Sequence, residues 1–397
     1  MRENMTRREL LAVSGLSLAA PAPRAPAAPV SIAKCDGYGD GLAPVLGKQF
    51  DQVGGIGKLV GGKTVAIKLN LTGGSRLGTY TPGQTHWVHP NLVGTCCQLL
   101  ARAGARRIRL LEGAGRGESL EDKMLNAGWD VAALRAAAPV VEFEDTNRLG
   151  GGKRYSRLKV ARPYVYPAFD LNHAFEDTDV FLSLSKLKHH EECGITLTIK
   201  NSFGITPNSI YGDDAGVDEP NENWRRGREA ILHYGKRQPP KSAPQEVDFS
   251  SERFEGHRVP RICVDLIAAR PVDLAIIDGI ECSVGGEGPW VKGFQYARPQ
   301  VLIVGRNPVC ADAVATAVMG YNPRAKRGET PFHRMTAAKP GELEWAENPM
   351  LLAEAVGIGS ADLDRIDVRG VPIKDALYDF EKRGRSTPPP VSPVARP

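Results

Sequence analysis

Short apolar runs alternate with helix-like patterns along most of the chain. Apolar runs that are rich in β-branched residues and bounded by polar or glycine-containing turns are typical of buried strands. The predicted strands are residues 64–71, 107–112, 140–143, 164–169, 180–184, 272–280 and 300–305. Helical periodicity marks residues 90–105, 119–129, 261–269 and 308–319, and a last helix and strand lie within 349–368. This alternation predicts an α/β fold in which a largely parallel or mixed sheet is flanked by helices.

One long polar stretch interrupts the alternation. Residues 208–256 are rich in Asn, Asp, Gly, Pro and charged side chains and contain few apolar runs. We expect a surface insertion or lid rather than a second core. The regular pattern on both sides predicts a single α/β domain over residues 31–375. Residues 376–397 end in a proline-rich sequence and are predicted to be a disordered tail.

The first 30 residues have the layout of an export signal. Arg7 and Arg8 precede a modestly apolar stretch, which an Ala/Pro-rich region suited to cleavage follows. This order is typical of a bacterial twin-arginine signal peptide. It predicts the twin-arginine translocase as a partner and a periplasmic or otherwise exported location. The apolar part is too short for a stable membrane span, so none is expected after cleavage.

Charge and cysteine content narrow the classes of function. The formal net charge is +5, and the chain has no long basic run and no basic stripe interleaved with aromatic residues. Nucleic-acid binding is therefore not expected, whereas a small anionic molecule fits a mildly basic chain. The seven cysteines include no CxxC pair. An iron–sulfur cluster or a zinc knuckle is therefore not expected.

The densest set of chemical side chains lies in residues 179–207. The predicted strand at 180–184 is followed by a second β-rich run at 195–199, which is also a predicted strand. Reactive groups at strand ends are where open α/β sheets usually hold their ligands. The side chains that follow the two runs include Lys186, Lys188, His189, His190, Cys193, Lys200 and Asn201.

Chemistry suggests a role for each of these groups. The predicted catalytic residues are Lys188, His190 and Lys200, because a buried lysine can act as a base or nucleophile and a histidine can transfer a proton near neutral pH. The alternative for the lysines at 186 and 188 is a solvated turn at the strand end. The predicted substrate-binding residues are Lys68, Asn70, Lys186, His189 and Asn201. Of these, Lys68 and Asn70 stand two apart on one predicted strand and so face the same side.

Two pairs of residues suit a transition metal. His190 and Cys193 offer nitrogen and sulfur ligands within four residues, with Glu191 or Glu192 nearby. His86 and His89 stand just before the predicted helix at 90–105. For the second pair, capping the helix or contacting an anion is the alternative. Carboxylates beside other strand ends and glycine loops can orient a base or hold a metal. These second-tier candidates are Asp278, Glu281, Glu287 and Asp312.

Two glycine-rich segments are weak signals for nucleotide binding. Residues 57–64, GKLVGGKT, match the P-loop pattern, but a predicted strand follows the match, whereas a P-loop follows a strand and opens a helix. We interpret these residues as a helix-to-strand turn. Residues 113–117, GAGRG, do lie between a strand and a helix, but they lack the full dinucleotide fingerprint. A tight turn is the favoured interpretation there as well.

Taken together, several motifs resemble a bacterial and archaeal family, the domain of unknown function 362. The resemblance covers roughly residues 60–370, and its most specific motif is SLSKLKHHEECGITLTIKNSFG at 183–204. Many members resemble iron–sulfur proteins, because they carry an attached ferredoxin-like cysteine cluster. This chain lacks those cysteines, so that redox role is not implied. The other matching motifs are KLN at 68–70, HPNLV at 89–93, ARAGARRIRLLEG at 101–113, IIDGI at 276–280, GEGP at 286–289 and NPVCADAVATAVMGY at 307–321.

A second likeness is local. In nickel-pincer lactate racemases a histidine precedes, by about ten residues, a lysine that tethers a nucleotide-derived cofactor, and His190 and Lys200 are similar in their spacing. This resemblance implies a transition metal or a lysine-tethered cofactor. The predicted function is an exported enzyme that acts on a small anionic substrate by Lys/His acid–base, racemase-like or other metal- or cofactor-assisted chemistry. The alternative is a non-catalytic binding or carrier protein for such a ligand or for a metal.

Overall fold

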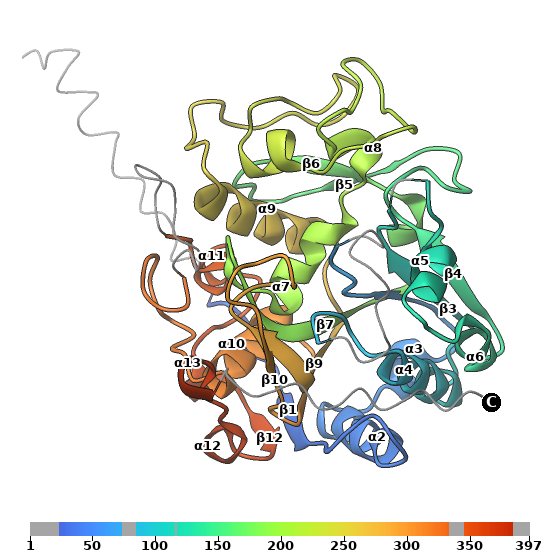
Figure 1. The fold of residues 1–397 in the computed structure, drawn as a ribbon, viewed down its shortest axis with the longest axis vertical. Coiled ribbons are helices and arrows are strands. Elements are labelled where there is room, and N and C mark those ends of the chain that lie inside the picture. The colour runs from blue at the N-terminus through green and yellow to red at the C-terminus, as the bar shows by residue number, and fades with distance from the viewer. Residues whose placement is uncertain (1–23, 74–84, 116, 333–344, 384–397) are drawn as a thin grey trace, which may run out of the picture.

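The computed structural model describes residues 24–73, 85–115, 117–332 and 345–383. Within these residues the chain forms a ten-stranded sheet and a separate β-hairpin (Figure 1). Eight strands follow one path in the order β12-β1-β11-β9-β7-β2-β3-β4, while β8 pairs with β7 and β10 pairs with β9. The strands of the sheet are β1 Val30–Lys34, β2 Thr64–Lys68, β3 Arg107–Glu112, β4 Val141–Asp145, β7 Val180–His190, β8 Gly194–Ile195, β9 Leu274–Val284, β10 Gln295–Ala297, β11 Val301–Gly305 and β12 Val368–Gly370, and the hairpin consists of β5 Ser156–Lys159 and β6 Ala168–Leu171.

Most neighbouring strands of the sheet are parallel. Strands β9, β7, β2, β3 and β4 run in one direction, whereas β11 is antiparallel to both of its neighbours, β9 and β1. This mixed and mostly parallel sheet confirms the predicted α/β fold. Parallel strands need crossover connections, which place helices on both faces of the sheet. The residues of β2, β7 and β11 are accordingly buried along the whole of each strand.

Helices cover the two faces of the sheet and build two apolar clusters. On β2, Val65 and Ile67 belong to the cluster with α2, α4, α5 and α6, whereas Ala66 belongs to the cluster with α7, α9, α10 and α11. The alternation follows from the two-residue period of a strand. The helices, several of which are seen on opposite sides of the sheet in Figure 1, are α2 Leu42–Gln52, α3 Gly57–Val60, α4 Pro90–Arg102, α5 Leu120–Asn126, α6 Val131–Ala136, α7 Leu197–Asn201, α8 Asn208–Tyr211, α9 Glu255–Ala269, α10 Pro308–Val318, α11 Pro349–Ala355, α12 Ile373–Ala376 and α13 Phe380–Arg383.

Most predicted elements are present, and one is wrong. The predicted strand at 107–112 is β3. The GKLVGGKT segment consists of α3, a turn at 61–63 and the first residue of β2, which is the predicted helix-to-strand turn. The second predicted strand, at 195–199, is wrong, because only Gly194 and Ile195 pair as β8 and the chain then enters α7. Leu197 makes this entry with a left-handed backbone, at a φ of 43°. Its β-branched neighbours favour a strand locally, but tertiary contacts override that preference.

The polar segment 208–256 lies beside β5, β6 and α9, at the top of Figure 1. It contains α8 and the π-helical turn η4 (Glu229–His233), joined by irregular chain. Several of its side chains are buried, among them Tyr211, Trp224 and Leu232. The Tyr211 hydroxyl accepts a hydrogen bond from the Asp170 amide of β6, at 3.1 Å. The segment is therefore anchored in the main core, and its role as a lid stays a prediction.

The two ends of the described chain are held by contacts with the domain. Ala25 is buried, and its carbonyl accepts a hydrogen bond from Arg365 Nη2 at 2.7 Å. Near the other end Phe380 is buried, and its amide donates to the carbonyl of Met319. The predicted tail from residue 376 thus begins in structured chain. Residues 1–23, with Arg7 and Arg8, and residues 384–397 lie outside the described residues.

None of the helices in the described residues combines the length and the apolar character that a membrane crossing requires.

Candidate functional site

A cavity of about 700 Å³ lies at the carboxyl ends of β2, β3, β4 and β7. The chain places β2, β3 and β4 in succession across the sheet and then returns to put β7 on the other side of β2. Ligands of open α/β sheets bind beyond the strand ends at such a reversal. The lining comes from these strand ends, from α7 and the turn after it, and from the segment 208–256. The cavity therefore lies at the strand ends, and whether it is a functional site stays a prediction.

A buried ion pair lies at the ends of β2 and β3. Lys68 Nζ donates to Glu112 Oε1 at 2.7 Å and to the Leu69 carbonyl at 2.7 Å. Glu112 also accepts hydrogen bonds from two backbone amides, those of Leu71 and Gly113. Burial lowers the pKa of Lys68, and the negative charge of Glu112 opposes that shift. Lys68, a predicted binding residue, thus lines the cavity with its charge already balanced.

Lys123 is a second buried ammonium group of the cavity wall, and sequence reasoning did not single it out. Its Nζ donates to the carbonyls of Leu71 at 2.8 Å and Gly113 at 3.1 Å. Burial lowers the pKa of Lys123, against the nearby charge of Glu112. These bonds tie the chain after β2 to the chain after β3.

Two asparagines, both predicted to bind substrate, form one hydrogen-bonded relay. Asn70 Nδ2 donates to Asn201 Oδ1 at 2.9 Å, and Asn201 Nδ2 donates to Ser183 Oγ at 3.0 Å. Asn70 Oδ1 is buried and has no hydrogen-bond partner among the residues described. Because a buried acceptor without a partner is unfavourable, this oxygen is suited to receive a hydrogen bond from a ligand.

His190, a predicted catalytic residue, lines the cavity from the last position of β7. Its Nδ1 accepts a hydrogen bond from the Glu192 amide at 3.2 Å. A nitrogen that accepts a backbone N–H carries no proton, so the neutral ring holds its proton on Nε2. Burial and the positive charge of Lys200 lower the pKa of His190 to about 4. The ring is therefore neutral at pH 7, with Nε2 as its remaining polar atom.

Lys200, the other predicted catalytic residue of the lining, projects from α7. Its ammonium nitrogen lies 4.5 Å from the centre of the Phe203 ring, as in a cation–π contact. In the described part of the chain no carboxylate lies within ion-pair distance of this nitrogen. Unlike Lys68, it can therefore neutralise a negatively charged ligand.

Asp312, a second-tier candidate, positions α7 rather than lining the cavity. Its two carboxylate oxygens accept hydrogen bonds from the amides of Thr198 at 2.9 Å and Ile199 at 2.8 Å. These are amides of the first turn of α7, which lack partners within the helix. Burial raises the pKa of Asp312 to about 7, against the effect of both amide bonds. Asp312 therefore acts on the site through the placement of Lys200 and Asn201.

The segment 208–256 adds arginines to the cavity wall. Arg228 Nη2 donates to Asn147 Oδ1 at 2.6 Å, which links the segment to the end of β4. Burial lowers the pKa of Arg228 to about 10, although Glu112 and Asp145 oppose the shift. The cavity as a whole is lined by three glutamates, Glu112, Glu118 and Glu229, and by six lysines and arginines, Lys68, Lys123, Lys200, Arg225, Arg226 and Arg228.

Two predicted lysines of β7 lie outside this lining. Lys186 Nζ donates to Asp278 Oδ2 at 2.8 Å and to the Tyr38 hydroxyl at 3.2 Å. Lys188 Nζ instead donates to the carbonyls of His86 at 2.7 Å and Glu287 at 2.9 Å. Burial lowers the pKa of Lys188 to about 7. Both amines are thus held by protein groups, and Lys188 titrates near neutrality.

The other predicted residues outside the lining also have protein partners. His189 Nε2 lies 2.8 Å from the Tyr321 hydroxyl, and its Nδ1 accepts from the Gly285 amide at 2.9 Å. Glu287 accepts hydrogen bonds from the Glu191 amide and from Trp290 Nε1. Glu281 Oε1 lies 4.0 Å from Arg298 Nε.

The residues predicted to bind a metal do not form one group in the described structure. His89 caps α4, since its Nδ1 accepts a hydrogen bond from the Asn91 amide, and this is the capping alternative of the sequence prediction. His86 lies near the rings of Trp290 and Phe294, and burial lowers its pKa to about 2. Cys193 is in the apolar core, where burial raises the pKa of its thiol.

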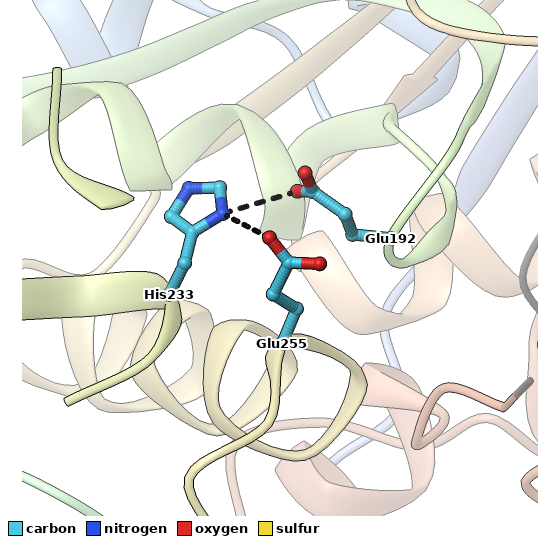
Figure 2. Close-up of side chains that lie close together, drawn as sticks. All are labelled: Glu192, His233 and Glu255. Atoms are coloured by element: carbon cyan, nitrogen blue, oxygen red, sulfur yellow. Dashed lines mark hydrogen bonds and ion pairs between the residues drawn. The ribbon is translucent and has the colours of Figure 1, made fainter. Parts of the chain in front are cut away.

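A different set of three metal-ligand side chains lies together in the described residues. These are Glu192, His233 and Glu255, which point toward one another in Figure 2. Burial acts to lower the pKa of His233, but the two carboxylates outweigh it and raise this pKa to about 9. His233 also lines the cavity. Sequence reasoning noted Glu192 beside His190 and Cys193 but missed His233 and Glu255, because the three stand in different segments without a recognisable spacing.

Comparison with known proteins places the chain in a family. A family model, described as a domain of unknown function (DUF362), matches residues 65–317. The chain belongs to the DUF362 family. Every residue that lines the cavity lies inside the matched range, so the cavity is a feature of the DUF362 part of the protein.

Two individual proteins are similar to this DUF362 chain. The thylakoid-associated protein sll1697 of Synechocystis sp. is 26% identical over 197 residues, which are 48% of this chain and 55% of that protein. The match thus spans about half the length of this relative. A crystal structure of a Thermotoga maritima protein aligns with 67% of this chain and 56% of its own, at 11% identity and a TM-score of 0.30.

Proposed function

We propose that this DUF362 protein binds a small anionic molecule in the cavity and acts on it by proton transfer. The observation that carries the proposal is the charge of the lining, in which six lysines and arginines face three glutamates. A surplus of one sign of charge in a cleft focuses the electric field and concentrates ligands of the opposite sign. Carboxylates and phosphates are the anionic groups that lysine and arginine bind best.

Three groups define how such a ligand would be held. Lys200 is the ammonium group that pairs with the negative charge, since no described carboxylate competes for it. Asn70 Oδ1 accepts a hydrogen bond from a hydroxyl or amino group on the ligand. His190 presents its Nε2–H as a neutral hydrogen-bond donor to a ligand oxygen on which negative charge develops during proton transfer, because its Nδ1 is already bound to the Glu192 amide. The favoured substrate class is therefore a small carboxylate or phosphate that also carries a hydrogen-bond donor.

The binding step is tested by replacing Lys200 with methionine, which keeps the length of the side chain and removes the charge. We expect Lys200→Met to weaken binding of the best small carboxylate or phosphate by about 1.5–3 kcal/mol, or roughly 10- to 150-fold in Kd. Isothermal titration of a panel of such compounds measures the change. The matched control is Lys236→Met, because Lys236 also lies over an aromatic ring, that of Tyr234, but is exposed and outside the cavity lining.

Unchanged affinity in Lys200→Met would overturn the proposed site, provided that the variant unfolds at the wild-type temperature. Equal losses in Lys200→Met and Lys236→Met would also overturn it, because the effect would then come from overall charge.

The alternative, a non-catalytic carrier of the same ligand, is also supported by the charge of the lining. The variant His190→Asn distinguishes the two, since asparagine retains an acceptor near Nδ1 for the Glu192 amide and removes Nε2. For an enzyme, we expect turnover to be lost while the ligand still binds. Intact-mass measurement of the mature protein addresses the lysine-tethered cofactor, because an adduct on Lys200 would add its mass to the chain.

We further propose that the protein is exported in its folded state by the twin-arginine translocase. The support is the arrangement of Arg7, Arg8, an apolar stretch and an Ala/Pro-rich region at the start of the chain. Cell fractionation of the full-length protein tests this location.

A further inference from the structure

Glu192, His233 and Glu255 meet beside the cavity although they come from three separate segments (Figure 2). Glu192 lies in the turn between β7 and β8, His233 ends the π-helical turn η4, and Glu255 begins α9. His233 Nδ1 is 3.5 Å from Glu192 Oε2 and 3.3 Å from Glu255 Oε1. One ligand atom from each residue lies within 4.8 Å of the other two.

The two distances fit a shared metal ion better than a shared proton. Hydrogen bonds between a charged N–H group and a carboxylate measure about 2.7–2.9 Å, and both observed distances are longer. A single hydrogen on Nδ1 that is shared between two oxygens makes only a bifurcated contact, which leaves both carboxylates weakly bound. By contrast, two atoms that each bind one zinc ion at about 2.0–2.2 Å lie roughly 3.3–3.5 Å apart in a tetrahedral site.

We propose that Glu192, His233 and Glu255 form a binding site for a divalent transition metal of the zinc class. One imidazole nitrogen and two carboxylate oxygens are ligands that zinc accepts, and the two negative charges balance a divalent ion. The side chains are sheltered but not sealed, with exposures of 19% for Glu192, 15% for His233 and 8% for Glu255.

The position of the site indicates a metal with an open coordination position. Three protein ligands leave a fourth position of a tetrahedron, and His233 belongs to the lining of the cavity. Structural zinc sites use four protein ligands, whereas sites that bind water or substrate use three. The metal would therefore present a Lewis-acidic position to the same cavity that carries Lys200 and His190.

The site also connects the segment 208–256 to the body of the domain. His233 lies in the middle of that segment, Glu255 lies at its end where α9 begins, and Glu192 belongs to the β7–β8 turn that precedes it. Because binding by ligands from separate segments contributes directly to folding free energy, a bound metal should hold η4 against the β7–β8 turn and α9. We therefore expect zinc to slow limited proteolysis within residues 208–256.

The test is a zinc titration of the mature protein after a chelator has removed bound metal. We expect wild type to bind one equivalent of Zn²⁺. The variants Glu192→Gln and Glu255→Gln keep the side-chain shape and remove one charge each. A change outside the ligand shell weakens metal binding roughly 10- to 100-fold. Because each of these variants changes a ligand itself, we expect both to lose more affinity for Zn²⁺ than that.

The matched control is His257→Gln. His257 Nδ1 lies 3.7 Å from Glu347 Oε2. Among the described residues no second carboxylate lies within ion-pair distance of this histidine, so it forms a pair with one carboxylate and not a cluster with two. This variant should bind Zn²⁺ like wild type. Melting temperatures without metal check that every variant folds, and added Zn²⁺ should raise them only for wild type and His257→Gln.

Two outcomes would overturn the metal site. The first is that wild type binds no stoichiometric Zn²⁺, which would make the cluster a hydrogen-bonded ion triad only. The second is that the two glutamine variants bind Zn²⁺ as tightly as wild type. The inference does not depend on the proposed anionic ligand. Lys200→Met should lose that ligand and keep zinc, so failure of one proposal is distinguishable from failure of the other.

Discussion

At the scale of single residues, partners that are distant in the chain decide what each lysine of the central stretch does. Lys186 is neutralised by Asp278, Lys188 donates to carbonyl oxygens, and Lys200 reaches the cavity without a described carboxylate partner. The sequence places all three amines at or near strand ends and predicts a role in the site for each of them. Only the fold separates them, because the charge and burial of a side chain depend on the elements that surround it.

Lys188 should make stability depend on pH above neutrality. Its pKa is lowered by burial to about 7 in the folded protein, whereas an exposed lysine titrates at about 10.4. Between these two pKa values the unfolded chain binds more protons than the folded protein does. The free energy of unfolding therefore falls as the pH drops from about 10 toward 7.

The variant Lys188→Met removes this contribution. Denaturant unfolding between pH 7 and 10 should show wild type gaining stability relative to Lys188→Met as the pH rises, by an amount on the order of a few kcal/mol. The exposed control Lys236→Met should keep the wild-type pH dependence. Parallel curves for wild type and Lys188→Met would contradict a lowered pKa.

At the scale of elements, α7 is where local preference and observed structure disagree. Residues 195–199 have the β-branched composition of a strand, yet the chain turns at Leu197 and forms a helix. The carboxylate of Asp312, on α10, accepts hydrogen bonds from the amides of Thr198 and Ile199 in the first turn of α7. The helix exists because of this contact and the burial of Leu197 and Ile199. It brings Lys200 and Asn201 to the cavity.

Replacing Asp312 with asparagine should therefore affect both stability and binding. One oxygen remains as an acceptor, but the amide nitrogen cannot accept, so the amide of Thr198 or Ile199 loses its partner. An unsatisfied buried N–H costs about 1–3 kcal/mol, and we expect that loss in denaturant unfolding, together with weaker binding of the anionic ligand.

The control for Asp312 is Asp130→Asn. Asp130 caps the exposed start of α6 through one hydrogen bond, from the Ala133 amide, and asparagine caps helices equally well. Its stability and binding should stay close to wild type. Normal ligand affinity in a destabilised Asp312→Asn would mean that Asp312 supports the core without positioning Lys200.

At the scale of the whole molecule, the order of strands and the segment 208–256 create the site. The return of the chain to β7 beside β2 places His190 and Asn201 opposite Lys68 and Asn70. The segment 208–256 then supplies Arg228 and His233. The cavity and the proposed metal site therefore both depend on how distant parts of the chain come together.

The whole molecule also constrains where an export signal can be removed. Ala25 is buried, its carbonyl binds Arg365, and the Pro26 carbonyl accepts a hydrogen bond from the Ser360 amide. We expect the mature exported protein to begin before Ala25. Replacing both Arg7 and Arg8 with lysine should keep the protein in the cytoplasm, because the twin-arginine route requires that pair.

Cell fractionation and intact-mass measurement check this export prediction. The single exposed control Lys374→Arg, far from the signal, should leave export unchanged. An exported and fully stable protein that begins after Val30 would contradict the role given to residues 25–29. Normal export of the double lysine variant would contradict the twin-arginine route.

The sequence by itself determined most strands and helices, the α/β class and the likeness to the DUF362 family. These follow from local periodicity and from contiguous motifs, such as residues 183–204, which a linear chain displays directly. It also located five of the cavity residues, because strand ends in open α/β sheets collect ligand-binding groups. These five are Lys68, Asn70, His190, Lys200 and Asn201.

Only the tertiary structure decided which side chains meet. Glu112 reached Lys68, Arg228 reached Asn147, and His233 came between Glu192 and Glu255 through contacts across the sheet and the segment 208–256. Such encounters depend on strand order and on chain crossovers, for which local preference carries no signal. Other long-range contacts, those of Asp312 with α7 and those of Asp278 and two backbone carbonyls with the lysines, accompany the helix at 197–201 and hold Lys186 and Lys188 outside the cavity lining. Burial and proximity then set the charges, because both are properties of the folded chain.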